Sequence, residues 1–337
     1  MRGSQSKFPF TAPFQRYRDG GADGDDSPQS IDFPGTDSMG TTADKIAKAI
    51  LAHERSGVID LSAYRAAKAA AENLLSDERL RELIATGHDP AHAALVYAQN
   101  FASLVAEQIS ATKELRHYAA IVGKAEDDYQ PGFPPMSPVT TSHFTTWAFF
   151  DVLFGQSHET IGTCLLRIAR DLPFPGWLVD AIDAMQNSRM SFYIHEGFED
   201  RFVRLREIGS EEVRVVHVGS HFNGVKGQIW FGRLVPPANS QVKYHVFFTT
   251  PYVLVETTES MIAEYFRREI ARLGNRRVPR GMDTREFILK HGPTPNHWNE
   301  YIFCAYYGHH NDAVFIKGVP DDTESLPHGS LMRTTRA

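Results

Sequence analysis

The feature that most constrains the fold is a change in hydrophobic spacing after about residue 187. Before this point, apolar side chains recur every three or four residues, as on one face of an α-helix. Beyond it, several segments alternate apolar and polar residues, which is the two-residue period of a half-buried strand. The sequence therefore predicts an α+β protein. Its N-terminal helical bundle is followed by a C-terminal module of helices around a small antiparallel β-meander or partly open barrel.

The first 125 residues predict a tail and a helical module. Residues 1–40 are rich in Gly, Asp, Ser and Pro, so they cannot bury enough apolar surface to offset their ordering entropy. We expect a disordered tail there. Residues 41–125 carry helical spacing almost throughout, with a helix start at Ser76 and a longer helix from about Asp89 to Ala119. Four helices with short joins fit an antiparallel bundle.

A proline-rich stretch, EDDYQPGFPPMSPVTTSH, separates this module from the rest of the chain. Prolines are excluded from helix interiors and remove donors from strand ladders, so residues 126–142 are predicted to be a linker. Residues 143–320 are predicted to form the α+β module, and the polar residues 321–337 a flexible tail.

Within the α+β module, the two periods and the turn residues predict individual elements. Helices are expected near 143–154, 158–171, 175–187, 257–273, 283–290 and 296–308. Two hairpins are expected, RFVRLREI with VRVVHV around GSEE, and GQIWFGRLV with QVKYHVFFT around PPANS. YVLVET and DAVFIKGV are expected to add further strands.

Charge and cysteine content limit the classes of function. The formal net charge of −6 argues against a general polyanion binder, which usually carries a basic excess. The two cysteines lie far apart, which favours reduced thiols over a disulfide framework. The N-terminus lacks the apolar run of a signal peptide, and no stretch is long and apolar enough to span a membrane. We therefore expect a soluble cytoplasmic protein without a membrane partner.

The stretch PNHWNEYIFCAYYGHHND, residues 295–312, is the first candidate site. On a helical wheel His297, Glu300 and Cys304 share the face opposite the apolar side, and His309 and His310 follow. These are competent ligands for a divalent metal such as zinc. The same groups could instead form a Cys304 nucleophile assisted by a histidine. Against both, the stretch has neither C-x2-C nor H-E-x-x-H, so a structural helix with a solvated end is the favoured interpretation.

A second cluster, SRMSFYIHEGFEDR, holds one imidazole and three carboxylates. Glycine after Glu196 predicts a turn, which would place His195, Glu196, Glu199 and Asp200 on a loop, where site residues often lie. Glu196 is therefore a candidate catalytic residue. The alternative is a charged loop that is simply solvated.

A third candidate is the basic segment RREIARLGNRRVPRGMDTRE. Arg276, Arg277 and Arg280 fall in the loop after a helix. The planar guanidinium group of arginine binds phosphate or carboxylate groups through two hydrogen bonds, which lysine cannot do. They are candidates for binding an anion or an acidic partner. A solvated helix end with salt bridges is the structural alternative.

Two hypotheses of function follow. The first is a non-catalytic interaction or regulatory module, with a protein as the favoured partner and nucleic acid as the less favoured one. The alternative is a metal-assisted or cysteine-dependent hydrolase with its site around residues 297–312. No motif for an organic cofactor is present in the sequence.

Overall fold

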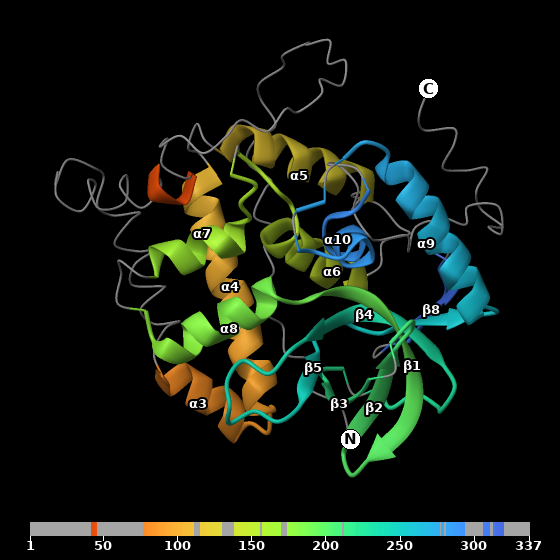
Figure 1. Ribbon diagram of the computed structural model, residues 1–337. Helices are drawn as coiled ribbons and strands as arrows, with labels where there is room; N and C mark the ends of the chain where they lie inside the picture. Colours follow the sequence, from red (N-terminus) through yellow and green to blue (C-terminus); the bar gives the residue numbers. More distant parts are fainter. Residues whose placement is uncertain are drawn as a thin grey trace, which may run out of the picture.

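Helices and a single mixed sheet make up the described part of the chain (Figure 1). The computed structural model describes residues 42–45, 77–110, 115–129, 138–155, 157–169, 174–210, 212–220, 222–276, 278–279, 281–293, 306–310 and 313–319. In the view of Figure 1 the helices form the upper and left-hand parts and the strands the lower right-hand part. The expected α+β class is confirmed. The predicted tails lie outside the described residues.

Five of the six helices predicted beyond residue 138 are observed close to their expected places, and most of the sixth, predicted over 296–308, lies outside the described residues. The observed helices are α3 (Asp77–Ala85), α4 (Pro90–Ser110), α5 (Arg116–Tyr129), α6 (Pro138–Phe150), α7 (Ile161–Ile168), α8 (Gly176–Gln186), α9 (Glu259–Leu273) and α10 (Thr284–His291).

Two helix boundaries in the N-terminal half differ from the prediction. The helix expected from Asp89 to Ala119 is two helices, α4 and α5. α5 continues to Tyr129 and α6 begins at Pro138, so both ends of the expected linker are helical. Proline is tolerated in the first turn of a helix because its missing N–H would have no partner there, which explains why Pro138 begins α6 rather than preventing it.

Capping residues fix where several helices begin. The Asp89 side chain accepts the N–H groups of Ala91 and His92 at the start of α4. Thr258 caps α9 in the same way, and Asp283 accepts two N–H groups of α10. Each cap satisfies donors that have no partner within the helix, so short polar side chains at these positions set the helix starts.

Five strands close into a barrel. They are β1 (Arg189–Glu199), β2 (Phe202–Glu207), β3 (Val213–Val218), β4 (Ile229–Val235) and β5 (His245–Phe247). The long strand β1 pairs with β2 through its second half and with β4 through its first half. β5 lies between β3 and β4, parallel to the first and antiparallel to the second. The barrel is therefore closed, whereas a meander or a partly open barrel was expected.

The connectivity of the barrel is a Greek key. β1, β2 and β3 follow one another as antiparallel neighbours, and β4 returns to lie beside β1. Both predicted hairpins are present, since β2 pairs with β3 around GSEE and β4 with β5 around PPANS.

The sheet continues beyond the barrel through β4. β6 (Tyr252–Val255) pairs with β4, β8 (Ala313–Lys317) pairs with β6 in parallel, and β7 (Tyr306–His310) forms the edge beside β8. The expected strands at YVLVET and DAVFIKGV are confirmed. The helix predicted over 296–308 is wrong for residues 306–308, which belong to β7. Adjacent tyrosines favour strands, and a short apolar run does not by itself distinguish the two periods.

Three hydrophobic clusters fill the described interior. The first joins buried residues of α4 through α8 and reaches the barrel at Val235 and Val246. The second lies between the sheet and the pair α9 and α10, and the third fills the barrel around Trp230. Helices from both sides of the predicted linker thus share one cluster, while the module boundaries themselves stay a prediction.

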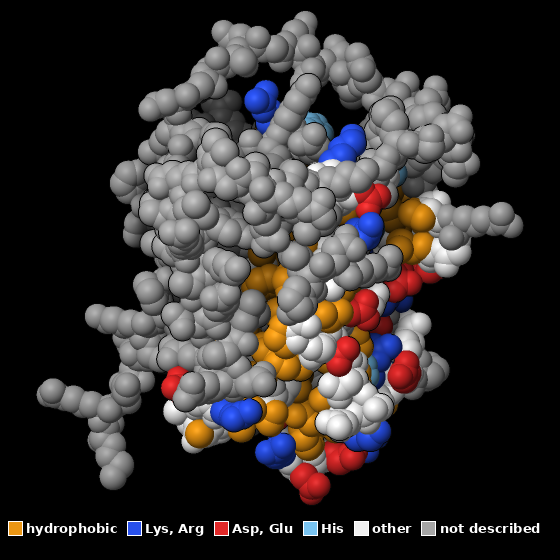
Figure 2. Space-filling view, turned by 90° about the vertical axis from the view of Figure 1, so that its left-hand side faces the viewer, with side chains coloured by type: hydrophobic (Ala, Val, Ile, Leu, Met, Phe, Trp, Pro, Cys, Tyr) orange, Lys and Arg blue, Asp and Glu red, His pale blue; other side chains and the backbone are white. Residues whose placement is uncertain are grey.

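Figure 2 views the side of the molecule on which α7 and α8 lie in Figure 1. Hydrophobic side chains gather near the middle of this face, and acidic and basic side chains lie along its lower edge. Partly buried hydrophobic residues packed on the first cluster include Leu166, Phe174 and Trp177. Among the described helices, none combines the length and the apolar character needed to cross a membrane.

Candidate functional site

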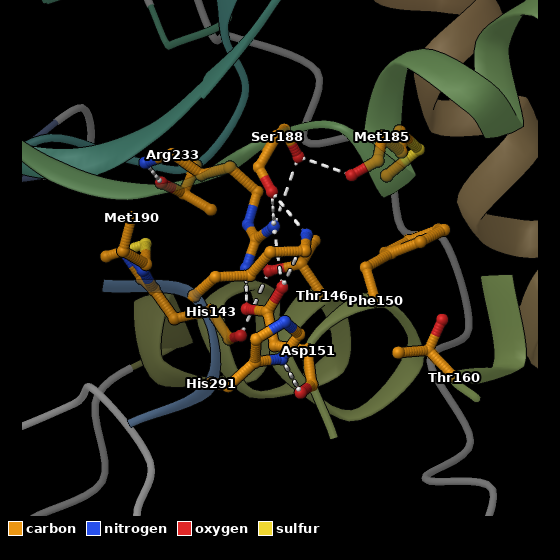
Figure 3. Close-up of polar contacts among 12 residues, drawn as sticks. His143, Thr146, Phe150, Asp151, Thr160, Met185, Ser188, Met190, Arg233 and His291 are labelled. Carbon is orange, nitrogen blue, oxygen red and sulfur yellow. Dashed lines mark hydrogen bonds and ion pairs between the residues drawn. The ribbon is translucent and has the colours of Figure 1, made fainter. Parts of the chain in front are cut away.

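Three charged side chains from distant parts of the chain meet in the interior where the helices join the barrel (Figure 3). Asp151 follows the end of α6, Arg233 lies in β4 and Lys290 lies in α10. Their exposed fractions are 1%, 0% and 8%. Charged groups are rarely buried to this extent unless they are paired, so the contacts of each one decide its role.

The terminal nitrogens of Arg233 and Lys290 face defined acceptors. The guanidinium of Arg233 binds both carboxylate oxygens of Asp151 through its two terminal nitrogens, and Nη1 also donates to the carbonyl and hydroxyl oxygens of Ser188 at 3.2 and 3.1 Å. Lys290 Nζ donates to Asp151 Oδ1 at 3.3 Å and to the carbonyl oxygens of Gln186 and Ser188 at 2.6 and 2.7 Å. The arrangement links α6, α8, β4 and α10.

The network holds two cations and one carboxylate. Burial, with a smaller contribution from the nearby Arg233, lowers the pKa of Lys290 to about 8, although Asp151 opposes both effects. The carbonyls at the C-terminal end of α8 carry partial negative charge, which offsets part of the excess positive charge. An ammonium group has three donors, and all three are used here. Lys290 is therefore a structural cation that holds the end of α8.

Two buried histidines flank this network in neutral form. His291 Nδ1 donates to the backbone carbonyl of Asp151 at 2.7 Å, and burial lowers the pKa of His291 to about 4. His143 contacts the carbonyl of Thr250 at 3.3 Å and lies against the ring of Tyr252, and burial lowers its pKa to about 3. Both rings are thus neutral near pH 7. Their contacts join the end of α6 to α10 and to the sheet.

The HEGFE cluster lies in β1 and not in the predicted loop. Gly197, with φ +114°, sits in a bulge where the β1–β2 register shifts, so the glycine marks a bulge and not a turn. The Gly197 N–H donates to His195 Nδ1 at 3.0 Å, so Nε2 carries the proton and donates to the Asn223 carbonyl at 3.0 Å. His195 is fully buried, and burial lowers its pKa.

The carboxylates of this cluster lie apart from that histidine. Glu196 is half-buried and accepts a hydrogen bond from Arg206 Nε at 2.9 Å. Glu199 and Asp200 are exposed at the β1–β2 turn. The catalytic role considered for Glu196 stays a prediction, and its observed partner is an arginine of the neighbouring strand.

The predicted metal or thiol site falls largely outside the described residues, since His297, Glu300 and Cys304 lie there. His309 and His310 belong to β7, where their backbones pair with Val314 and Ala313. Within the described ranges, no three His, Cys, Asp or Glu side chains are grouped to hold a metal ion. The metal and the cysteine hypotheses therefore stay predictions.

Of the three candidate arginines, the structure describes Arg276, while Arg277 and Arg280 lie outside it. Arg276 Nη1 donates to the Gly292 carbonyl at 2.8 Å, and its guanidinium lies 4.8 Å from the centre of the Phe287 ring. Burial lowers its pKa. The observed contacts of Arg276 are internal and attach the loop after α9 to α10.

A different set of side chains faces outward on the barrel. Val203, Leu205 and Val216 point into the core, so the alternating residues of β2 and β3 point away from it. We call the outward set the ring face. It consists of Phe202 and Arg204 of β2 and His217 of β3, together with Arg201, which precedes β2, and Tyr244, which precedes β5.

Aromatic contacts order the ring face. The rings of Phe202 and Tyr244 lie 4.8 Å apart, and the rings of His217 and Tyr244 lie 6.3 Å apart. The Arg201 guanidinium covers Phe202 at 5.0 Å from the ring centre. The Tyr244 hydroxyl contacts both carboxylate oxygens of Asp89, at 2.7 and 2.9 Å, so the β4–β5 connection is attached to the start of α4. These rings are held in place before any ligand is bound.

Three cations, Arg201, Arg204 and Lys243, lie close in sequence to these rings, and Arg201 contacts one of them. The side chain of Arg201 is 71% exposed, although it lies 3.8 Å from an oxygen of Asp89. Arg204 and Lys243 are exposed, and neither forms an ion pair with a described residue. The three rings are half-buried, and such a ring cluster with cations beside it can bind a ligand that has both flat rings and negative charge.

The sequence also contains signals for the charge network. Asp151 interrupts the apolar run TTWAFFDVLF, and Arg233 interrupts the apolar strand IWFGRLV. A single charge in each of two buried segments indicates that they pair, because a buried unpaired charge is costly. The sequence predicts the ring face less well than the charge network, because Tyr244 and Phe202 are far apart in the chain and come together only in the folded barrel.

Comparison with known proteins gives no further guide: no protein-family model, no curated protein and no solved structure matches the chain.

Proposed function

We propose that this chain is a non-catalytic binding protein that recognises its partner across the ring face of the barrel. The observation that carries the proposal is the contrast between two groups of polar residues. Asp151, Arg233 and Lys290 are buried and engaged with one another. Arg204 and Lys243 are exposed beside the fixed rings of the ring face, with no ion pair to a described residue.

The place of the ring face supports the same interpretation. Five-stranded Greek-key barrels of the OB type bind oligonucleotides and oligosaccharides across their second and third strands and the loops beside them. Here the ring face covers β2, β3 and the β4–β5 connection. A shared architecture does not fix a function, so this analogy only adds to the side-chain evidence. The residues of the alternative, a hydrolase around 297–312, lie largely outside the described part of the chain.

Hydrogen–deuterium exchange tests the proposal. The full chain is incubated separately with a single-stranded oligonucleotide, a neutral oligosaccharide and an acidic peptide. We expect at least one probe to slow exchange in β2, β3 and residues 236–244, and Phe202→Leu to remove that protection. Arg267→Gln, at an exposed arginine of α9, is the control that should leave it unchanged. Protection confined to other segments, or none with any probe, would refute the proposal.

A further inference from the structure

We infer that the ligand of the ring face is a single-stranded nucleic acid, an inference that rests on the proposed binding function and names its ligand. The rings provide the first reason. Phe202 and Tyr244 lie side by side at 4.8 Å with an angle of 37° between their planes, and His217 follows at 6.3 Å from Tyr244. Unpaired bases stack on such side chains whatever their sequence, because every base has a flat π-face.

The space next to Arg204 provides the second reason. In the strand registers Arg204 stands between Gly197 of β1 and Val215 of β3. Glycine has no side chain, and a Cβ at Gly197 would meet no atom within 4 Å. The guanidinium thus has open surface on the β1 side and no carboxylate among the described residues as an ion-pair partner. A phosphate group next to a stacked base would find an available cation at this place.

The alternatives use only part of this surface. A neutral oligosaccharide would stack on the rings but would leave Arg204 and Lys243 without a role. An acidic peptide would use the cations but has no series of flat rings. A double helix hides the faces of its bases in the stack, so it would meet the cations without the rings. Single strands match both features.

Charge limits how strong this binding is. Arg201, Arg204 and Lys243 are the cations near the rings, whereas Glu199 and Asp200 are exposed carboxylates at the β1–β2 turn. With about three phosphate contacts, the logarithm of the affinity should fall with the logarithm of salt concentration with a slope of about −2. That corresponds to roughly 20-fold weaker binding at 200 mM than at 50 mM salt. The carboxylates should oppose binding, so their removal should strengthen it.

Fluorescence anisotropy with a labelled oligothymidylate of about 12 nucleotides measures these effects on the full chain. We expect Phe202→Leu to weaken binding about tenfold, since one stacking contact is lost. Arg204→Gln should weaken binding and make the salt slope shallower by about 0.7, and Glu199→Gln should strengthen binding. Arg267→Gln is the matched control and should change neither quantity. Circular dichroism verifies that each variant is folded.

Three results would overturn the inference: no binding at 50 mM salt, equal binding of the duplex form, or binding that Phe202→Leu and Arg204→Gln leave unchanged. The oligosaccharide and peptide probes separate this inference from the proposed function. Protection of the ring face by either of them, with none by the oligonucleotide, refutes the nucleic acid and retains the binding surface. Absence of protection with every probe refutes both.

Discussion

Replacing Asp151 with asparagine tests whether the buried charge network holds the helices on the barrel. The substitution keeps the shape of the side chain but removes the only carboxylate among the three charged groups. Arg233 and Lys290 would then lie 0% and 8% exposed without a counter-charge. Removing one partner of a buried ion pair costs about 3–5 kcal/mol, because the remaining charge is left uncompensated.

The pKa of Lys290 places the expected loss near the lower end of that range. Its folded value of about 8 lies one unit above neutral pH, so releasing its proton at pH 7 costs about 1.4 kcal/mol. Without Asp151 this pKa falls further, and Lys290 becomes neutral at that limited cost. We expect Asp151→Asn to lower the free energy of unfolding by about 3 kcal/mol at pH 7. The loss should be smaller at pH 9, where Lys290 of the unchanged protein has also released its proton.

Urea unfolding followed by tryptophan fluorescence measures this loss, because Trp147 and Trp230 are buried. Lys290→Met and the double variant Asp151→Asn/Lys290→Met complete a cycle. The loss of unfolding free energy in the double variant should be smaller than the sum of the two single losses by at least about 1 kcal/mol, because the double variant leaves one unpaired cation fewer than Asp151→Asn does. A loss below about 1 kcal/mol for Asp151→Asn, or strictly additive losses, would refute the reasoning.

Further predictions concern single groups. The pKa of His291 is about 4 in the folded protein and 6.5 in the unfolded chain, so the folded state binds fewer protons between these pH values. The free energy of unfolding should therefore fall by up to about 3 kcal/mol as the pH drops from 6.5 towards 4. The urea midpoint of the His291→Gln variant should depend less on pH than that of the unchanged protein. Gly197→Ala should destabilise the protein by about 1–2 kcal/mol, because φ at this position is +114°. Gly123→Ala within α5 should stabilise the protein by about 0.5–1 kcal/mol, since alanine favours a helix more than glycine does. Thermal unfolding measures both changes, and equal effects of the two substitutions would contradict the assignment of the bulge. Cys164 is 0% exposed, so a thiol reagent should modify it only after denaturation; rapid reaction of one thiol in the native protein would then report Cys304 and support the hydrolase alternative.

Local patterns predicted much of the secondary structure. The hairpins around GSEE and PPANS followed from alternating residues next to turn residues, and the starts of α9 and α10 coincide with their caps. The closure of the barrel could not be predicted from local patterns, because the β1–β4 and β3–β5 pairings join strands that are not neighbours in the chain. The glycine after Glu196 was interpreted as a turn, since a bulge and a turn use the same residue for the same backbone freedom.

The candidate sites were harder to predict, because convergence in space has no local pattern. Asp151 and Arg233 each stand alone in an apolar segment, so pairing could be expected but not the choice of partners. His195 was grouped with carboxylates close in sequence, yet its ring contacts the Asn223 carbonyl and the Gly197 N–H. Nearness in sequence was a poor guide, since alternate residues of β1 face opposite sides of the barrel wall.

The order in which the members of the charge network are synthesised follows from their positions in the sequence. Asp151 and Arg233 are 82 residues apart, whereas Asp151 and Lys290 are 139 residues apart. At about 5–20 residues per second, the ribosome adds Lys290 about 3–11 s after Arg233. The chain therefore contains the neutral pair and the acceptors at the end of α8 before the second cation is added. A nascent chain that stops before α10 would keep the balanced pair but leave the Gln186 and Ser188 carbonyls without their lysine donor.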